Sequence, residues 1–136
     1  KKEDLYCIYV GIAAKKSIRS RLNWHVNDPH TLGRVKSGTL STLRQSISSI
    51  IAGNQLAKKE TNDFIDRLTI EYFIIDRAIS SKDSQEASEE LNKIERKLMS
   101  DKLYILNIKD NKHEKSIRLI YELKKVRKES KAKAIQ

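Results

Sequence analysis

The sequence has little of what stabilises or anchors many small proteins. Cys7 is its only cysteine, so no disulfide can form within the chain, and we expect an intracellular, cytoplasmic protein. The apolar residues around Cys7 predict a thiol packed in the core. No apolar run approaches the roughly 20 residues that span a bilayer, so we expect no membrane partner. With one proline, four glycines and no internal repeat, the 136 residues are expected to form one domain.

Acidic residues are also in short supply. The chain has 28 lysines and arginines against 18 aspartates and glutamates, which gives a formal net charge of +10. A domain this basic commonly binds a polyanion, because cations on a phosphate backbone release condensed counterions. Charge alone leaves open a basic protein that binds no nucleic acid. Residues 112–136 carry nine lysines and arginines against three glutamates. They form either a solvated helix face or an arm that contacts phosphates.

Hydrophobic periodicity predicts a mixture of strands and helices. Three apolar, β-prone runs are expected to be strands, and five segments with apolar residues at helical spacing are expected to be helices. The expected strands are 5–11, 69–76 and 103–106, and the expected helices are about 18–27, 41–52, 60–68, 80–101 and 113–129. Residues 28–39 are expected to form a loop, and the residues after 129 a polar tail. The order predicts an α/β (α+β) fold, with a small three-stranded, mostly antiparallel sheet flanked by helices.

The loop at 28–39 and the helix after it carry groups that suit a phosphate backbone. Cations, small hydroxyls and the free N–H groups of a helix start all bind phosphate oxygens. We predict DNA contacts from Arg34, Lys36, Ser37, Thr39 and Arg44. The alternative is a flexible surface loop with a helix cap at Thr39 or Ser41. Trp24, on the preceding helix, either covers the core or stacks on a base.

Candidate catalytic residues begin near the N-terminus. Tyr9 precedes Gly11 on the first expected strand. Arg21 and His25 are four residues apart on the next helix, so their side chains share one face. An arginine there can hold two phosphate oxygens, and a histidine can move a proton or form a hydrogen bond to a phosphate. Taken alone, the pair also fits a surface arginine and a half-buried histidine.

Two further candidates lie far downstream. Glu95 is at the margin of an apolar helix stripe, where a carboxylate can point into a cleft and hold a divalent metal ion. Asn107 follows the last expected strand. Each also has an ordinary structural explanation, as an exposed helix glutamate and as a turn asparagine.

Taken together, these residues make the stretch from Leu5 to Asn107 resemble the GIY-YIG nuclease superfamily. Tyr9-Val10-Gly11 matches the YIG half of the name motif, and Arg21 and His25 match the arginine and the aromatic or histidine that follows it. Glu95 matches the metal-binding glutamate, and Asn107 matches the asparagine near the end of that domain. The GIY half has no match in this chain and would have to lie before Lys1. Because two extra residues separate Gly11 from Arg21, Arg19 is a rival for the arginine role.

The resemblance implies a GIY-YIG-like nuclease domain over residues 1–110, with residues 111–136 as a basic C-terminal helix or tail of the same domain. It implies metal-dependent hydrolysis of DNA by a restriction- or repair-type endonuclease. Glu95 would bind Mg²⁺ or Mn²⁺, and Arg21 would stabilise the phosphate charge. A tyrosine or His25 would help to activate the attacking water, with Tyr9 in the hydroxyl network, and Asn107 would orient the ligands on the metal side.

DNA is then the expected partner, and cutting both strands would call for a homodimer or two sequential events. Two other functions stay open. One is a catalytically inactive nucleic-acid-binding module on the same fold. The other is a protein-interaction domain, which the net charge disfavours.

Overall fold

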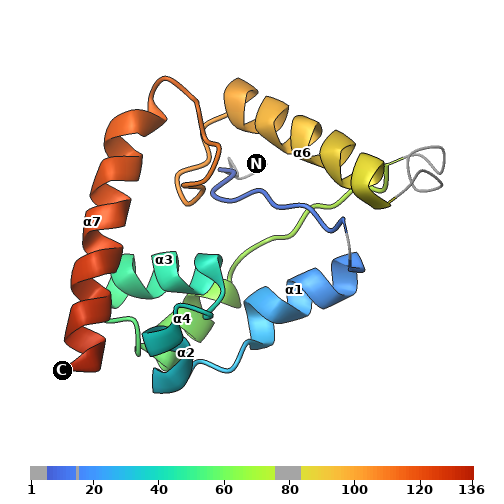
Figure 1. The fold of residues 1–136 in the computed structure, drawn as a ribbon. Coiled ribbons are helices and arrows are strands. Elements are labelled where there is room, and N and C mark those ends of the chain that lie inside the picture. Colours follow the sequence, from blue (N-terminus) through green and yellow to red (C-terminus); the bar gives the residue numbers. More distant parts are fainter. Residues whose placement is uncertain (1–5, 15, 76–83) are drawn as a thin grey trace, which may run out of the picture.

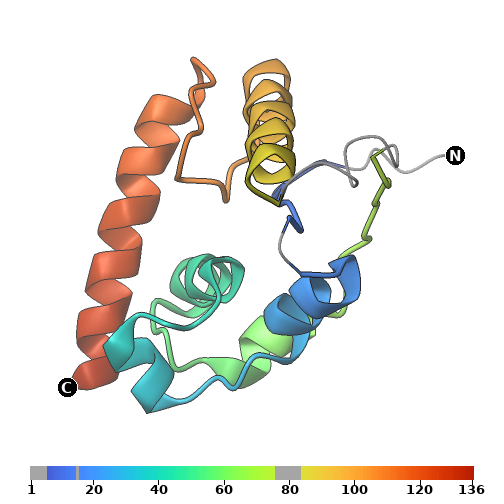
Figure 2. The same cartoon turned by 45° about the vertical axis from the view of Figure 1, so that its right-hand side comes forward.

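The chain folds into an assembly of helices. The computed structural model describes residues 6–14, 16–75 and 84–136. The helices are α1 (Ile18–Asn27), α2 (Leu32–Ser37), α3 (Thr42–Ala52), α4 (Lys58–Ile65), α6 (Ser84–Asp101) and α7 (Ser116–Ile135). Figure 1 shows α7 along one side of the molecule, α1 to α4 gathered at one end and α6 at the other. The N-terminal segment passes between α6 and α1 in both Figure 1 and Figure 2.

The predicted α/β fold is wrong, because the described residues contain no strand and no sheet. The backbone N–H of Leu106 donates to the carbonyl of Ile8 at 2.9 Å, but the chain turns at once, with Asn107 N–H bonding back to the Tyr104 carbonyl. The predicted strand at 103–106 therefore ends before a ladder can form.

The other two predicted strands are extended segments. In the second, the large apolar side chains of Ile70, Tyr72, Phe73 and Ile74 are all more than half exposed. A β-prone run forms a strand when a neighbouring strand pairs with it, so β propensity without such a partner leaves the segment extended. Leu5 and Asp76, at the ends of two predicted strands, lie outside the described residues.

The prediction for Cys7 is also wrong, because its thiol is exposed. It was expected on a strand covered on both faces, and the extended segment that carries it has no such cover. Among the described residues, no helix is both long enough and apolar enough to cross a bilayer.

The helices follow the sequence more closely. The predicted bounds of α1 are confirmed, and those of α3 and α4 differ by one to three residues. The predicted loop at 28–39 instead contains α2, which Thr31 caps by accepting from Arg34 N–H. Gly38 ends it in the left-handed conformation, at φ 72°. Residues 80–83 of the predicted fourth long helix lie outside the described residues.

The C-terminal residues form helix where a polar tail was expected. α7 continues to Ile135, because its last turns pack against the rest of the molecule. The Ser130 hydroxyl lies 2.5 Å from the Ser49 hydroxyl on α3, and Ala134 is buried with Val35 and Leu40. Small side chains at this contact let the two helix backbones approach closely.

A modest core places the candidate site. Leu43 and Ile47 of α3, Ile65 of α4 and Leu106 form one buried cluster, and Ile8, Tyr9 and Val26 pack against it. The Asn107 side chain adds a polar clamp to this cluster. Its Oδ1 accepts from Val10 N–H at 2.9 Å, and its Nδ2 donates to the Val10 carbonyl at 2.8 Å. The clamp fixes the backbone directly between Tyr9 and Gly11.

We predict that Asn107→Ala lowers the free energy of unfolding by about 1–3 kcal/mol, because it leaves the partly buried N–H and C=O of Val10 without partners. Urea unfolding measures the change. Asn27→Ala is the matched control, since it removes an exposed amide that donates to Asn23; we expect a change within about 0.5 kcal/mol. Equal effects of the two variants would contradict the clamp.

Candidate active site

Helix α1 brings Arg21 and His25 to one place. Ser17 caps the helix by accepting from Ser20 N–H at 3.1 Å, and Val26 packs on the core. This orientation buries His25, which is 5% exposed, and leaves Arg21 half-buried at the edge of the core. The rival Arg19 is exposed, so Arg21 is the arginine that lies with the other candidate residues.

Aromatic contacts join this helix to the N-terminal segment. The Tyr9 ring meets the His25 ring edge-on, with centroids 5.3 Å apart. The Arg21 guanidinium lies 4.7 Å from the centre of the Trp24 ring. Gly11 sits against the same group: a Cβ there would be 3.2 Å from the Tyr9 ring and 3.8 Å from Arg21 Nη2. The absence of a side chain at Gly11 thus allows tyrosine, histidine and arginine to converge.

Two side-chain nitrogen atoms in this group have no hydrogen-bond partner. They are Nε of Arg21 and Nε2 of His25, and both atoms are buried. In the part of the chain that the structure describes, one other buried side-chain atom, Oγ of Ser46, is left in this state. A buried polar group without a partner destabilises a fold by about 1–3 kcal/mol, so such groups concentrate where a ligand completes them. A phosphate oxygen accepts hydrogen bonds from both kinds of donor.

The opposite edge of the His25 ring is held by buried polar groups. Its Nδ1 lies 3.0 Å from Oγ of Ser41, and Asp28 accepts from Ser41 N–H at 2.8 Å. Burial, and then the positive charge of Arg21, lower the pKa of His25 to about 4, against the opposing effect of Asp28. The imidazole is therefore neutral at physiological pH.

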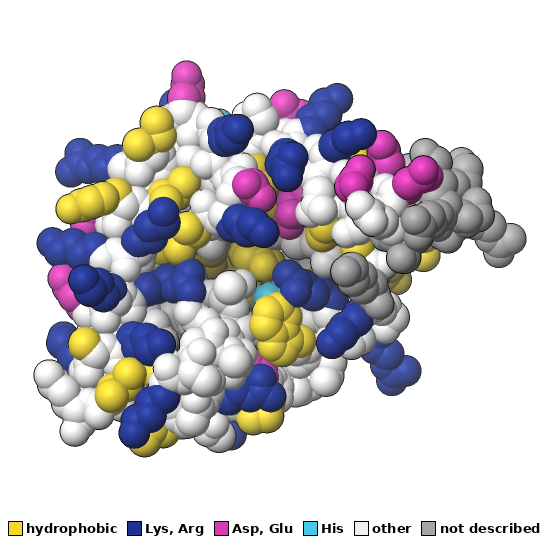
Figure 3. Space-filling model, viewed as in Figure 1, with side chains coloured by type: hydrophobic (Ala, Val, Ile, Leu, Met, Phe, Trp, Pro, Cys, Tyr) yellow, Lys and Arg dark blue, Asp and Glu magenta, His cyan; other side chains and the backbone are white. Residues whose placement is uncertain are grey.

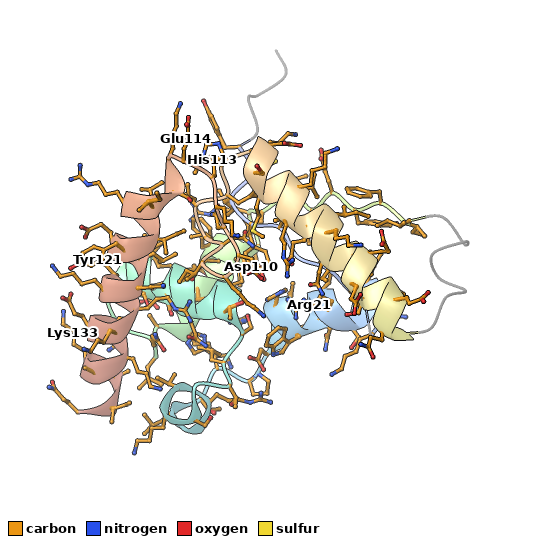
Figure 4. The ribbon with its side chains drawn as sticks, turned by 45° about the horizontal axis from the view of Figure 1, so that its top comes forward. Arg21, Asp110, His113, Glu114, Tyr121 and Lys133 are labelled. Atoms are coloured by element: carbon orange, nitrogen blue, oxygen red, sulfur yellow. The ribbon has the colours of Figure 1, made fainter. Side chains whose placement is uncertain are left out.

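Glu95 lies on α6, and its carboxyl interacts electrostatically with Arg21. Partial burial raises the pKa of its carboxyl; Arg21 opposes this shift, and Asp110 adds to it. Figure 4 shows Arg21 on α1 and Asp110 on the connection between α6 and α7, both near the centre of the molecule. No ion pair links Glu95 to Arg21 within the described ranges, so neither side chain is engaged by the other.

The donor set around Glu95 fits a hard divalent cation. Mg²⁺ is commonly bound through one or two carboxylates and keeps several of its waters. Glu95 is one such carboxylate, and Asp110 is a second whose charge helps to raise the pKa of Glu95. The described residues contain no group of three or more histidine, cysteine, aspartate or glutamate side chains that could enclose a metal ion.

Asn107 lies beside this group, but its amide is occupied. Both of its polar atoms bond to Val10, and Asn111 donates to the Asn107 carbonyl at 3.0 Å. Asn107 therefore places the segment that carries Tyr9. Asn111 supports the turn around Asn107, and no sequence pattern singled it out.

A cleft of about 470 Å³ opens beside Arg21. Its lining comes from α1, from the chain just before and after it, and from α2: Lys16, Ser20, Arg21, Asn23, Trp24, Asn27, Asp28, Pro29 and Arg34. Figure 3 shows lysine and arginine side chains spread across the face of the molecule seen in Figure 1, and acidic side chains gathered over α6. The cleft thus offers cations, amides and an indole ring next to the unpartnered donors.

The residues predicted to contact DNA divide into two groups. Arg34 lines the cleft, although Asp28 lies 3.5 Å from its guanidinium, and Lys36, Ser37 and Thr39 are exposed on and after α2. Arg44 is 1% exposed. Its guanidinium donates to the carbonyls of His25 and Val26, so its donors are engaged inside the protein.

Several lining residues escaped the sequence analysis, although a signal was present. Ser20, Asn23 and Asn27 recur at helical spacing with Trp24 and form the second face of α1, beside the apolar one. Asp110 had no such signal, because its approach to Glu95 depends on how the connection after α6 folds. Trp24, for which two roles were open, is half-buried and lines the cleft.

Comparison with known proteins identifies the family of this domain. The family model of the GIY-YIG catalytic domain matches residues 1–129. The chain therefore belongs to the GIY-YIG catalytic domain family, and the predicted resemblance is confirmed. This is a nuclease-type domain, whose substrate is a nucleic acid. No curated protein and no solved structure matches the chain.

The buried histidines predict a dependence of stability on pH. In the folded state the pKa of His25 is about 4 and that of His30 is also lowered, chiefly by burial, whereas an unfolded histidine titrates near 6.5. Between these values the unfolded chain binds more protons, so stability is full above about pH 6.5 and falls as the pH falls towards 4.

We expect His25 to account for at most about 3 kcal/mol of this loss. The measurement is urea unfolding of the wild type and of His25→Gln between pH 7 and pH 4. The difference in the free energy of unfolding between the two proteins should narrow as the pH falls. His30 should contribute the same loss of stability to both. A difference that is constant across this range would show that His25 titrates normally in the folded protein.

Proposed function

We propose that this domain is a metal-dependent DNA endonuclease of the restriction or repair type. The observation that supports this most directly is the pair of buried, unpartnered donors on α1, Arg21 Nε and His25 Nε2, beside Tyr9 and within electrostatic reach of Glu95. A phosphodiester has the acceptor oxygens that these donors lack, and its hydrolysis builds negative charge that a guanidinium stabilises.

Each residue has a defined task in this proposal. Arg21 and His25 bind the scissile phosphate, and Tyr9 presents its hydroxyl beside them. Asn107 holds the Tyr9 backbone through Val10. Glu95 would bind Mg²⁺ or Mn²⁺, and a metal ion bound there supplies a Lewis acid for the phosphoryl oxygen.

The cleft beside Arg21 is the proposed path of the cut strand. Lys16 and Arg34 would contact its phosphates, and Trp24 offers a ring on which a base can stack. Lys36, Ser37 and Thr39 extend this surface along α2. Arg44 is not part of it, because it is buried. One such site cuts one strand at a time, so a double-strand break requires a homodimer or a second event.

We predict that Glu95→Ala and Glu95→Gln lower the rate of plasmid nicking in Mg²⁺ or Mn²⁺ by at least roughly a hundredfold, because a metal contributes several kcal/mol of charge stabilisation in the transition state. DNA affinity measured in EDTA should change little. Glu86→Gln is the matched control, an exposed glutamate of the same helix, and should nick at the wild-type rate.

Robust nicking by either Glu95 variant would rule out the metal-binding role of this carboxylate. A wild-type protein that binds DNA but nicks none with any divalent ion would instead be a catalytically inactive nucleic-acid-binding module.

A further inference from the structure

The hydroxyl of Ser41 sits between two helices and contacts the catalytic histidine. Ser41 is fully buried, at 0% exposure, and it is the N-cap of α3. Its Oγ accepts from Arg44 N–H at 3.3 Å and lies 3.0 Å from Nδ1 of His25. Its own backbone N–H is taken by Asp28. The hydroxyl and the backbone N–H of Ser41 are therefore both held by hydrogen-bond contacts.

The Ser41 hydroxyl proton has one acceptor among the contacts of Oγ. A serine hydroxyl has one proton to donate and two lone pairs to accept with. One lone pair already receives the Arg44 N–H. In the stretches that the structure describes, the acceptor within reach of the hydroxyl proton is Nδ1 of His25. A ring nitrogen that accepts a hydrogen bond carries no proton, so a neutral imidazole held this way carries its proton on Nε2.

We infer that Ser41 locks His25 in the Nε2–H form and so makes it a hydrogen-bond donor to a phosphate oxygen, and not a base. This inference rests on the proposed nuclease function and assigns His25 one of the two roles that an imidazole could have there. Ser41 is a positioning residue, because it acts through the ring.

Three observations agree with a phosphate as the acceptor. Nε2 of His25 is buried and without a partner, so its N–H is a donor that the protein leaves unused. Nε of Arg21, four residues earlier on the same helix face, is in the same state. Burial keeps the ring neutral, since the pKa of His25 is about 4. A neutral donor and a cationic donor then face one anion. Arg21 has no lone pair to accept a proton from water, and that of His25, on Nδ1, already accepts from Ser41. Of the two groups considered for activating water, this leaves a tyrosine.

His30 is an internal control, because it has the same tautomer but both of its ring nitrogens contact other groups of the protein. Its Nε2 donates to the Gln55 carbonyl, and its Nδ1 lies 3.3 Å from Nη1 of Arg44, which can only donate. His30 is therefore also protonated on Nε2, but its N–H is already used inside the protein. We expect it to be insensitive to added phosphate.

The test is nitrogen NMR of the imidazole rings at neutral pH, with the His25 signals identified by their loss in His25→Gln. The wild type should show a protonated Nε2 and an unprotonated Nδ1 at His25. Inorganic phosphate, added without metal, should shift the Nε2–H signal of His25 and leave that of His30 in place. A wild-type ring protonated on Nδ1, or an Nε2–H signal that ignores saturating phosphate, would overturn the inference.

Variants separate the hydroxyl from its capping role. Ser41→Ala should increase the Nδ1–H population of His25 and weaken phosphate binding about tenfold or more, the usual effect of losing a hydrogen bond to a charged group. Ser41→Thr keeps the hydroxyl and should restore both readouts. Ser17→Ala removes the cap of α1, the helix that carries His25, and should change neither. A Ser41→Ala protein with an unchanged tautomer would contradict the role of Ser41.

The outcomes also separate this inference from the proposed function. A protein that never nicks DNA but shows the phosphate-induced shift at His25 would lose the proposed activity and keep the donor role. A protein that nicks DNA in a Glu95-dependent manner, with His25 protonated on Nδ1, would keep the activity and lose the donor role.

Discussion

The buried guanidinium of Arg44 is the interaction on which this arrangement depends. It lies on α3 and reaches into the C-terminal end of α1, where the carbonyls of the last helical turn have no partner within the helix. Its Nε donates to the His25 carbonyl at 2.7 Å, and Nη2 donates to the Val26 carbonyl and to Asn62 Oδ1 on α4. Asp28 attracts it electrostatically. One side chain therefore fixes α1 against two other helices and sets the distance between His25 and Ser41.

This constraint connects the fold to the chemistry. Because the end of α1 is held, the face that carries Arg21 and His25 keeps its orientation towards the N-terminal segment. Asn107 holds that segment from the other side by bonding to Val10. Tyr9 then meets His25 across the edge of the core. Residues that hold the fold together surround the site. Two of the three buried side-chain atoms left unpaired in the described residues, Arg21 Nε and His25 Nε2, lie within it.

The sequence predicted the helices better than the rest of the fold, and the reason is physical. Capping and helical periodicity are local, so Ser17, Ser41 and Gly53 mark helix ends without reference to the rest of the chain. A strand depends on a partner strand. The apolar pattern of residues 69–75 did not reveal that no strand pairs with them in the part of the chain that the structure describes. The end of α7 depended on a contact with α3 that no local pattern records.

In the candidate site, too, local patterns were predicted from the sequence and contacts between separate helices were not. Arg21, His25, Tyr9 and Glu95 were identified from order and spacing. The structure brings Tyr9, His25 and Arg21 into one group, and Arg21 affects the pKa of Glu95. Arg44 was singled out for its charge, and the structure shows that its donors are used within the fold. Ser41 was considered as a cap, but its contact with His25 joins residues from different helices and became visible with the packing of α1 on α3.

In the proposed nuclease, Arg21, His25 and Glu95 converge on one phosphorus atom. A crystal structure of the wild-type protein with a DNA duplex and Ca²⁺, a cation that commonly binds in place of Mg²⁺ without supporting cleavage, tests it most directly. We expect one phosphate that accepts from Arg21 and from His25 Nε2, with Ca²⁺ between that phosphate and Glu95. DNA bound along the outer face of α7, where Tyr121 and Lys133 lie (Figure 4), with no phosphate near Arg21, would contradict it.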